Sequence, residues 1–257
     1  MDWTIAQRPA PSWAVSQRAA PSWTVTTTLQ GVDGFNMALY GTPIAYYSMA
    51  ETALGDGASV SRFEELLGTG PVMDAPSGSE EGTYEAATSS VLFDGSDHYE
   101  PTSGGTAFDT LHQTAGTIAV RYYNDNATSF EALFGSSNSG SKVGLTLWRR
   151  SNTIRFILSN GSSAVYNASS SAVVSAGWVN AIWAWDATSV MFWVEGVAAG
   201  TTASGGSLSG AVAGSNYEIG RTGGTWTFGE RISKILIWSD KITSAGSIAD
   251  IQTELAA

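Results

Sequence analysis

Three absences in this sequence limit what the protein can be. No cysteine occurs among its 257 residues, so stability must come from buried apolar surface rather than from disulfides. No apolar run reaches the roughly 18 residues that a membrane span needs, and we expect no membrane insertion. The amino terminus, Met1-Asp2-Trp3, lacks a basic stretch followed by an apolar core. We therefore expect no signal peptide.

Positive charge is also scarce. The chain has 12 Lys and Arg residues against 23 Asp and Glu residues, which gives a net charge of −11. Residues 51–100 hold eleven of the acids and a single base, Arg62. Such a field repels phosphates, so we expect no nucleic-acid partner. A plain soluble surface, a basic partner or bound calcium would each fit this acidity.

The sequence offers little of what catalysis needs. Its two histidines, His98 and His112, stand in no metalloprotease spacing, and no G-x-S-x-G nucleophile elbow is present. Glycoside hydrolysis needs two facing carboxylates, whereas the acids at 80–100 fall in loop-like sequence. These patterns predict a protein that is not an enzyme, although they do not exclude a Ser-His-Asp triad.

The first thirty residues form a ten-residue repeat in which tryptophan, isoleucine or valine, and proline recur in phase. Alternation places the apolar side chains on one face of an extended chain, and the prolines prevent a helix. Thirty residues cannot bury three indoles, each worth about 2–3 kcal/mol of burial. We expect this arm to dock onto another subunit, with packing on its own domain or disorder as alternatives. The predicted contact residues are Trp3, Arg8, Pro11, Trp13, Arg18, Pro21 and Trp23.

The remaining chain has the pattern of short β-strands. Asn160-Gly161 and Glu195-Gly196 each separate apolar runs, as in tight hairpins whose turn residues take positive φ. Alternation within 178–186 and 232–238 predicts strands with apolar side chains on both faces, as in a sandwich whose outer faces are partly covered. A capping-box pattern at Ser247-x-x-Asp250 predicts a helix over 247–255. A similar pattern at 61–64 predicts another short helical turn.

Six segments follow one another in a recognisable order: Ala45–Glu51, Ser90–Tyr99, Gly116–Tyr122, Ala176–Asp186, Val194–Val197, and Glu218–Arg221 with Phe228–Trp238. They resemble the corresponding segments of laminin-G-like modules, of the concanavalin A-like lectin/glucanase class. The resemblance implies an all-β fold, a two-sheet antiparallel jelly-roll sandwich with an extended N-terminal arm and a short C-terminal helix. The expected organisation is an arm at 1–30, a linker at 31–43 and the sandwich at 44–257. The E-x-D-x-x-E pattern of the related glucanases is missing.

The same resemblance implies two kinds of site. Laminin-G-like modules often hold calcium at a rim, for which Asp94, Asp97, Asp125 and Asn126 are the candidate ligands; no other cofactor is expected. Lectin-like sandwiches bind sugars through loop aromatics and amides, for which the candidates are Trp226, Tyr122, Tyr123 and Asn124. Trp148-Arg149-Arg150 is the only paired-basic site and would suit an acidic partner or an exposed strand end.

Taken together, these features favour a non-enzymatic virion structural protein, because the repeated arm also resembles leaders of tailed-phage virion proteins. Such a protein, made in the host cytoplasm and displayed on the virion surface, would decorate a capsid or belong to a tail. Its arm would contact other virion subunits, and a homo-oligomer is expected. The alternative is a carbohydrate-binding adhesion module that takes a host glycan. A glycoside hydrolase is less favoured.

Overall fold

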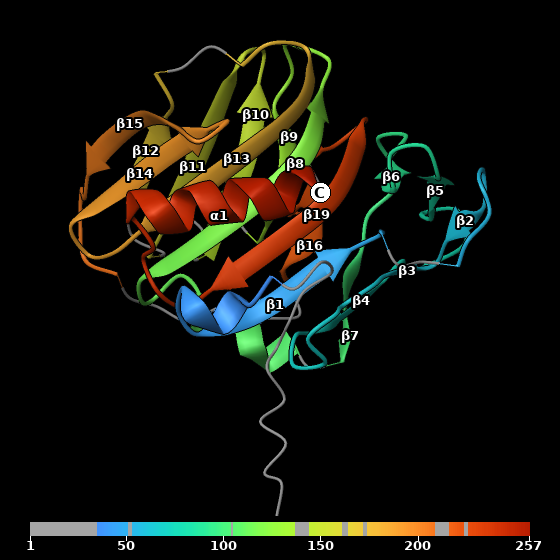
Figure 1. Cartoon of the computed structure of the whole chain (residues 1–257), viewed down its shortest axis with the longest axis horizontal. Helices are drawn as coiled ribbons and strands as arrows, with labels where there is room; N and C mark the ends of the chain where they lie inside the picture. Colours follow the sequence, from blue (N-terminus) through green and yellow to red (C-terminus); the bar gives the residue numbers. More distant parts are fainter. Residues whose placement is uncertain are drawn as a thin grey trace, which may run out of the picture.

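The computed structural model describes residues 35–50, 53–103, 105–136, 144–160, 164–171, 174–208, 216–223 and 226–257. Two large antiparallel sheets pack face to face, and one helix covers the outside of the larger sheet (Figure 1). The predicted arm, with Trp3, Arg8, Pro11, Trp13, Arg18, Pro21 and Trp23, lies outside the described residues.

The larger sheet has nine strands, in the order β15-β14-β13-β8-β19-β6-β5-β2, with β1 paired to β19. Its strands are β1 (Pro43–Ser48), β2 (Ser59–Val60), β5 (Gly82–Glu85), β6 (Ser90–Leu92), β8 (Gly116–Asn124), β13 (Gly177–Trp185), β14 (Ser189–Val194), β15 (Val197–Ala203) and β19 (Arg231–Trp238). The facing sheet has the order β12-β11-β10-β9-β16. Its strands are β9 (Glu131–Gly135), β10 (Gly144–Arg150), β11 (Thr153–Ser159), β12 (Ala164–Ser169) and β16 (Glu218–Ile219).

Two small sheets and three helical segments complete the described fold. These are β3 (Arg62–Phe63), β4 (Val72–Asp74) and β7 (Glu100–Ser103), the hairpin β17 (Arg221–Thr222) and β18 (Trp226–Thr227), and the helical segments η2 (Met37–Leu39), η3 (Gly105–Phe108) and α1 (Ala245–Ala256). No helix in the described parts of the chain is long and apolar enough to cross a membrane.

Strand alternation explains how the layers are filled. On β13, Ala181 and Trp183 enter the core between the sheets, while Ile182 and Ala184 belong to a second apolar cluster on the outer face. Neighbouring β19 divides its side chains in the same way between the two clusters. This confirms the predicted sandwich with apolar residues on both faces of its strands.

Helix α1 closes the outer apolar cluster. It packs against β8 and β13 and buries Ile248, Ile251 and Leu255, as the periodicity predicted. Its N-cap is Ser244, whose hydroxyl accepts the Ser247 backbone N–H at 3.2 Å. The helix therefore begins one residue after that cap, before the predicted capping box.

Local turn chemistry is partly as predicted. Between β14 and β15, Glu195 and Gly196 have φ of 50° and 74°, the left-handed conformation that a tight hairpin requires. Strands β11 and β12 pair across the predicted Asn160-Gly161 hairpin. The helical turn predicted at 61–64 is wrong: this segment contains β3, because Phe63 is drawn into the core and Arg62 pairs with Asp74 across the strands.

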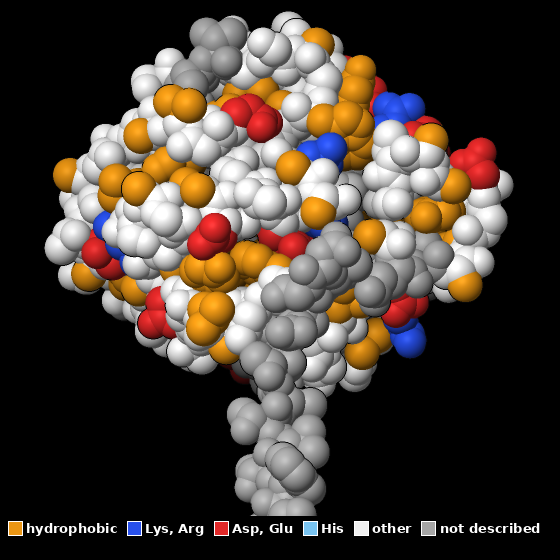
Figure 2. All heavy atoms as spheres, viewed as in Figure 1, with side chains coloured by type: hydrophobic (Ala, Val, Ile, Leu, Met, Phe, Trp, Pro, Cys, Tyr) orange, Lys and Arg blue, Asp and Glu red, His pale blue; other side chains and the backbone are white. Residues whose placement is uncertain are grey.

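Packing also begins ahead of residue 44, inside the segment predicted to be a linker. Met37 in η2 is fully buried in the outer cluster, and its carbonyl accepts the Trp238 indole N–H at 3.1 Å. Hydrophobic side chains gather beside α1 on this face of the molecule, while charged side chains are few and spread over it (Figure 2). Residues 35–43 thus take part in the folded body.

Candidate functional site

The outer face of the five-stranded sheet carries aromatic and basic side chains. On β10, Leu145 and Leu147 point into the core, so alternation turns Trp148 and Arg150 to the opposite face. On β11, Arg155 stands directly across from Trp148 in the strand register. Strand pairing therefore places Trp148 and Arg155 side by side, with Arg150 on the same face of the sheet.

Rings from a loop and from a separate hairpin complete this surface. Trp226 of β18 stacks on Trp148 with ring centroids 4.7 Å apart and planes 4° apart. Phe130, just before β9, lies 4.2 Å from Trp148 and 5.7 Å from Trp226. We call Phe130, Trp148, Arg150, Arg155 and Trp226 the tryptophan ledge.

The rings of the ledge differ in exposure. This difference indicates which ring supports the others and which rings can contact a ligand. Trp148 is only 3% exposed, whereas Trp226 and Phe130 are half-buried. Trp148 therefore fixes the other two rings, and these offer apolar surface to a ligand. Its indole nitrogen is buried and makes no hydrogen bond within the described residues.

Both arginines of the ledge lie over its rings. The Arg150 guanidinium is 4.4 Å from the Phe130 centroid, and that of Arg155 is 4.8 Å from the Trp148 centroid. Neither has a carboxylate partner among the described residues. Burial and then the charge of Arg150 lower the pKa of the Arg155 guanidinium. An acidic protein thus carries a local excess of positive charge on this face, suited to an anion.

Of the four sugar-binding residues predicted from sequence, only Trp226 belongs to the ledge. The structure corrects the expectation for Tyr122 and Asn124, which are both fully buried. Tyr122 points into the core against Phe228, since it occupies the inward phase of β8. Tyr123, on the opposite face of that strand, packs edge-on against Trp178. These four side chains therefore do not form one surface.

Asn124 has a structural role instead. Its side-chain carbonyl accepts from the buried guanidinium of Arg149 at 3.0 Å, and its amide donates to Asn126 at 2.8 Å. The same guanidinium contacts Asp125 and Glu131, each at 2.5 Å. Arg149 therefore gathers three acceptors at the rim between the sheets, which is how its buried charge is compensated.

The predicted calcium ligands lie in two loops. Asp97 accepts the Asp94 backbone N–H at 2.8 Å, and Asp94 accepts both the backbone N–H and the hydroxyl of Ser96. These hydrogen bonds, first of all those from Ser96, lower the pKa of Asp94. In the other loop Asp125 is paired with Arg149, as described above, and Asn126 has a left-handed φ of 63°. Both loops are held by their own hydrogen bonds, and calcium binding there stays a prediction.

A small pocket lies on the other side of the sandwich, at the carboxyl end of α1. It has a volume of about 230 Å³ and is lined by Arg121, Trp178, Ser233 and Lys234 among others. The Arg121 guanidinium sits 5.1 Å from the Trp178 ring centroid and donates to Asn180 at 3.1 Å. This pocket combines an aromatic ring with a cation, as the ledge does.

Comparison with known proteins identifies the family. Residues 93–246 match the Laminin_G_3 domain, described as the concanavalin A-like lectin/glucanases superfamily, and the chain belongs to this family. No curated protein matches the sequence significantly. The fold resembles the CBM40 domain of the Ruminococcus gnavus IT-sialidase bound to alpha2,3 sialyllactose. The TM-score is 0.52 at 16% identity, covering 62% of this chain and 94% of that one.

A second solved structure shares the fold at a similar level. It is the binding domain of Botulinum neurotoxin DC in complex with rat synaptotagmin II, with a TM-score of 0.52 and 11% identity. This likeness covers 83% of the present chain and 52% of the toxin domain. At such identities the two structures support the sandwich architecture and leave the ligand to be argued from the site itself.

Sequence reasoning found part of the ledge and missed the rest. Trp226 is one of the loop aromatics that the sequence offers for sugar binding, and Trp148 and Arg150 belong to the paired-basic motif. Alternation against Leu145 and Leu147 is a signal that could have placed both residues on the outer face. Nothing in the sequence signals that Phe130 and Trp226 meet at Trp148, because they come from separate segments.

Proposed function

We propose that this protein is a carbohydrate-binding module that takes acidic glycans on the tryptophan ledge. The observation that carries the proposal is the partly exposed Trp226, stacked on Trp148 beside two arginines that have no carboxylate partner in the part of the chain that the structure describes. An aromatic face packs against the apolar C–H face of a pyranose ring, and a guanidinium binds a carboxylate or sulfate in a charge-assisted pair.

Family and fold support a binding role without specifying the ligand. One structural neighbour is a carbohydrate-binding module complexed with a sialylated sugar, and the other is a toxin binding domain complexed with a protein receptor. We favour a glycan because the ledge is a small stacked aromatic surface and not a broad apolar patch. We favour an acidic one because Arg150 and Arg155 stand together on a chain of net charge −11. We assign the module no catalytic step.

Titration calorimetry with 3′-sialyllactose, and with lactose as the neutral counterpart, tests this proposal on the full chain. We expect binding of the acidic sugar that weakens with added salt, since screening reduces the arginine contribution. Trp226→Ala should lower the affinity about tenfold, equivalent to ~1.4 kcal/mol. Arg155→Ala should abolish the preference for the acidic sugar over lactose.

Trp178→Ala is the matched control, because it removes a half-buried tryptophan beside an arginine at the α1 pocket. Affinity that falls in Trp178→Ala and not in Trp226→Ala would move the glycan site to that pocket. The proposal would be refuted if none of the acidic glycans on a broad array bound the protein in an assay sensitive to millimolar affinities.

A virion role is a separate proposal carried by the arm. It rests on the repeat at 1–30 and on the free energy that Trp3, Trp13 and Trp23 would gain by packing against a surface that excludes water. Deleting residues 1–30 should then prevent incorporation into particles and leave glycan affinity unchanged. Normal incorporation of the truncated chain would contradict the virion role without affecting the proposed glycan site.

A further inference from the structure

Three side chains with metal-binding chemistry meet where the segment before β7 crosses β16. Tyr99 and Ile219 exchange backbone hydrogen bonds of 3.0 and 2.9 Å, which form a single antiparallel bridge. His98 and Glu100 flank Tyr99 and so lie on one side of its strand, while Glu218 precedes Ile219. One potential ligand atom from each of His98, Glu100 and Glu218 lies within 4.8 Å of the others.

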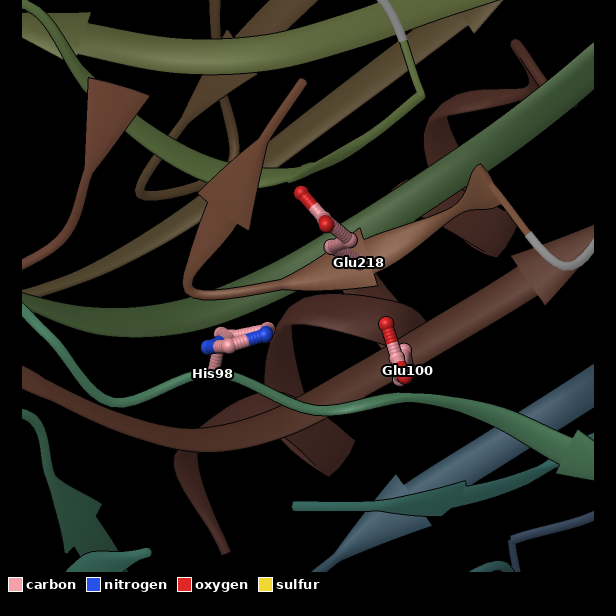
Figure 3. Close-up of side chains that lie close together, drawn as sticks. All are labelled: His98, Glu100 and Glu218. Carbon is pink, nitrogen blue, oxygen red and sulfur yellow. The ribbon is translucent and has the colours of Figure 1, made fainter. Parts of the chain in front are cut away.

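The ring of His98 is set up as a ligand by its own hydrogen bond. Nδ1 lies 3.2 Å from the Ser96 carbonyl oxygen, which can only accept. The proton therefore sits on Nδ1, and the Nε2 lone pair is free. A backbone carbonyl that holds the second ring nitrogen is the usual support of a metal-binding histidine. Figure 3 shows a ring nitrogen of His98 directed toward the side where the two glutamates lie.

Two acceptor atoms at this point are buried without partners. The His98 side chain is 1% exposed, and its Nε2 makes no hydrogen bond within the described residues. Glu218 is 8% exposed, and its Oε1 accepts from Arg221 at 2.8 Å. Its Oε2 has no hydrogen-bond partner in the described parts of the chain. An unsatisfied buried acceptor destabilises the folded chain, because it has lost its hydrogen bonds with water and gained none in return. A cation between them would satisfy both.

The donor set selects the class of cation. Calcium and magnesium take oxygen ligands, which disfavours both at a site with an imidazole. Zinc and similar transition metals accept one imidazole with carboxylates, and three protein ligands leave a fourth position for water. Glu218 can accept the Arg221 hydrogen bond through Oε1 while Oε2 binds the metal, because the ion pair with Arg221 involves Oε1.

We propose that His98, Glu100 and Glu218 bind one divalent transition-metal ion, such as zinc, which ties the 98–100 segment to β16. The ion would reinforce the Tyr99–Ile219 bridge, a junction between the three-stranded sheet of β7 and the five-stranded sheet of β16. Its role is structural: it would hold these sheets together at the Tyr99–Ile219 bridge, where their backbones meet.

Calorimetric titration of the tag-free, chelator-treated full chain with Zn²⁺ tests the site. We expect one saturable site and a melting temperature that rises with zinc concentration, because the ion binds the folded state. Glu100→Gln, at a partly exposed position, should keep the fold and weaken zinc binding at least tenfold. His98→Gln should remove the absorption bands of bound Co²⁺ that nitrogen ligation produces.

Glu64→Gln is the control, since Glu64 is an exposed acid in the same acidic stretch of the chain and is not part of the cluster. It should leave zinc affinity unchanged. The proposal fails if the wild-type chain shows no saturable zinc site. It also fails if zinc binds equally to wild type, Glu100→Gln and His98→Gln, because the ion would then reside elsewhere. Calcium binding that is tighter than zinc binding and lost in Glu100→Gln would overturn the choice of metal.

Discussion

The outer faces of the two sheets differ in whether their apolar side chains are covered. On the nine-stranded sheet, α1 covers the apolar cluster, and a buried ion pair joins Lys234 to Glu254 at 3.6 Å. On the five-stranded sheet, aromatic rings stay partly exposed and two arginines have no carboxylate partner in the described chain. The covered face of the nine-stranded sheet therefore contributes stability. The open face of the five-stranded sheet keeps aromatic rings and guanidinium groups that can contact a ligand. The difference can be tested by mutating each face and measuring stability and binding.

The buried ion pair should give the largest effect. Glu254→Ala removes the carboxylate that is paired with the almost fully buried ammonium of Lys234, which also donates to the Glu254 backbone carbonyl at 2.7 Å. We expect the free energy of unfolding to fall by about 3 kcal/mol, as measured by urea denaturation. Arg150→Ala on the open face is the comparison, and its change should stay within about 0.5 kcal/mol. Equal losses in the two variants would contradict the division of roles between the faces.

A smaller effect is expected where α1 begins. Ser244→Ala removes the hydroxyl that caps the helix at the Ser247 N–H, and should cost about 1 kcal/mol of stability. Ser244→Asp restores an acceptor at the same place and should recover most of that loss. Glycan affinity, measured on the same samples, should not change, because the ledge lies on the opposite sheet. A parallel loss of affinity would show that the two faces are coupled.

The smallest effect concerns pH. Burial alone would raise the pKa of Asp186, but hydrogen bonds from Thr188 and Ser189 and the ammonium of Lys241, 3.1 Å away, lower it well below its ordinary value. A lowered folded-state pKa contributes stability above the unfolded value of about 4, and this contribution disappears as pH falls through the folded-state pKa. We expect Asp186→Asn to lower the melting temperature at pH 7 by up to about 3 °C.

That difference should shrink as the pH drops from about 4 toward 2, because Asp186 of the unfolded wild-type chain then takes up a proton that the folded chain does not yet bind. Thermal melts of both proteins across this range provide the measurement. A difference that stays constant with pH would mean that Asp186 acts through geometry and not through its charge. This turn supports the covered sheet, so glycan binding should again be unaffected.

Much of the fold was predictable from local patterns. The alternation in β13 and β19, the positive-φ pair Glu195-Gly196 and the apolar spacing of α1 each follow from residues close together in sequence. The mistaken helical turn at 61–64 and the misplaced cap of α1 show the limit of such patterns. At 61–64 a distant partner decided the outcome, because Phe63 entered the core. At α1 the cap is a nearby residue, Ser244, which begins the helix ahead of the predicted capping box.

The sequence by itself determined that this chain is a cysteine-free, acidic β-sandwich with one covering helix, because hydrophobic periodicity and turn chemistry act between near neighbours. Only the tertiary structure decided which side chains meet. It brought Trp226 onto Trp148, buried Tyr122 and Asn124, and set His98 beside Glu218. The physical reason is that sheet order and register are fixed by packing over the whole molecule, and a pattern within one strand carries no record of its neighbours.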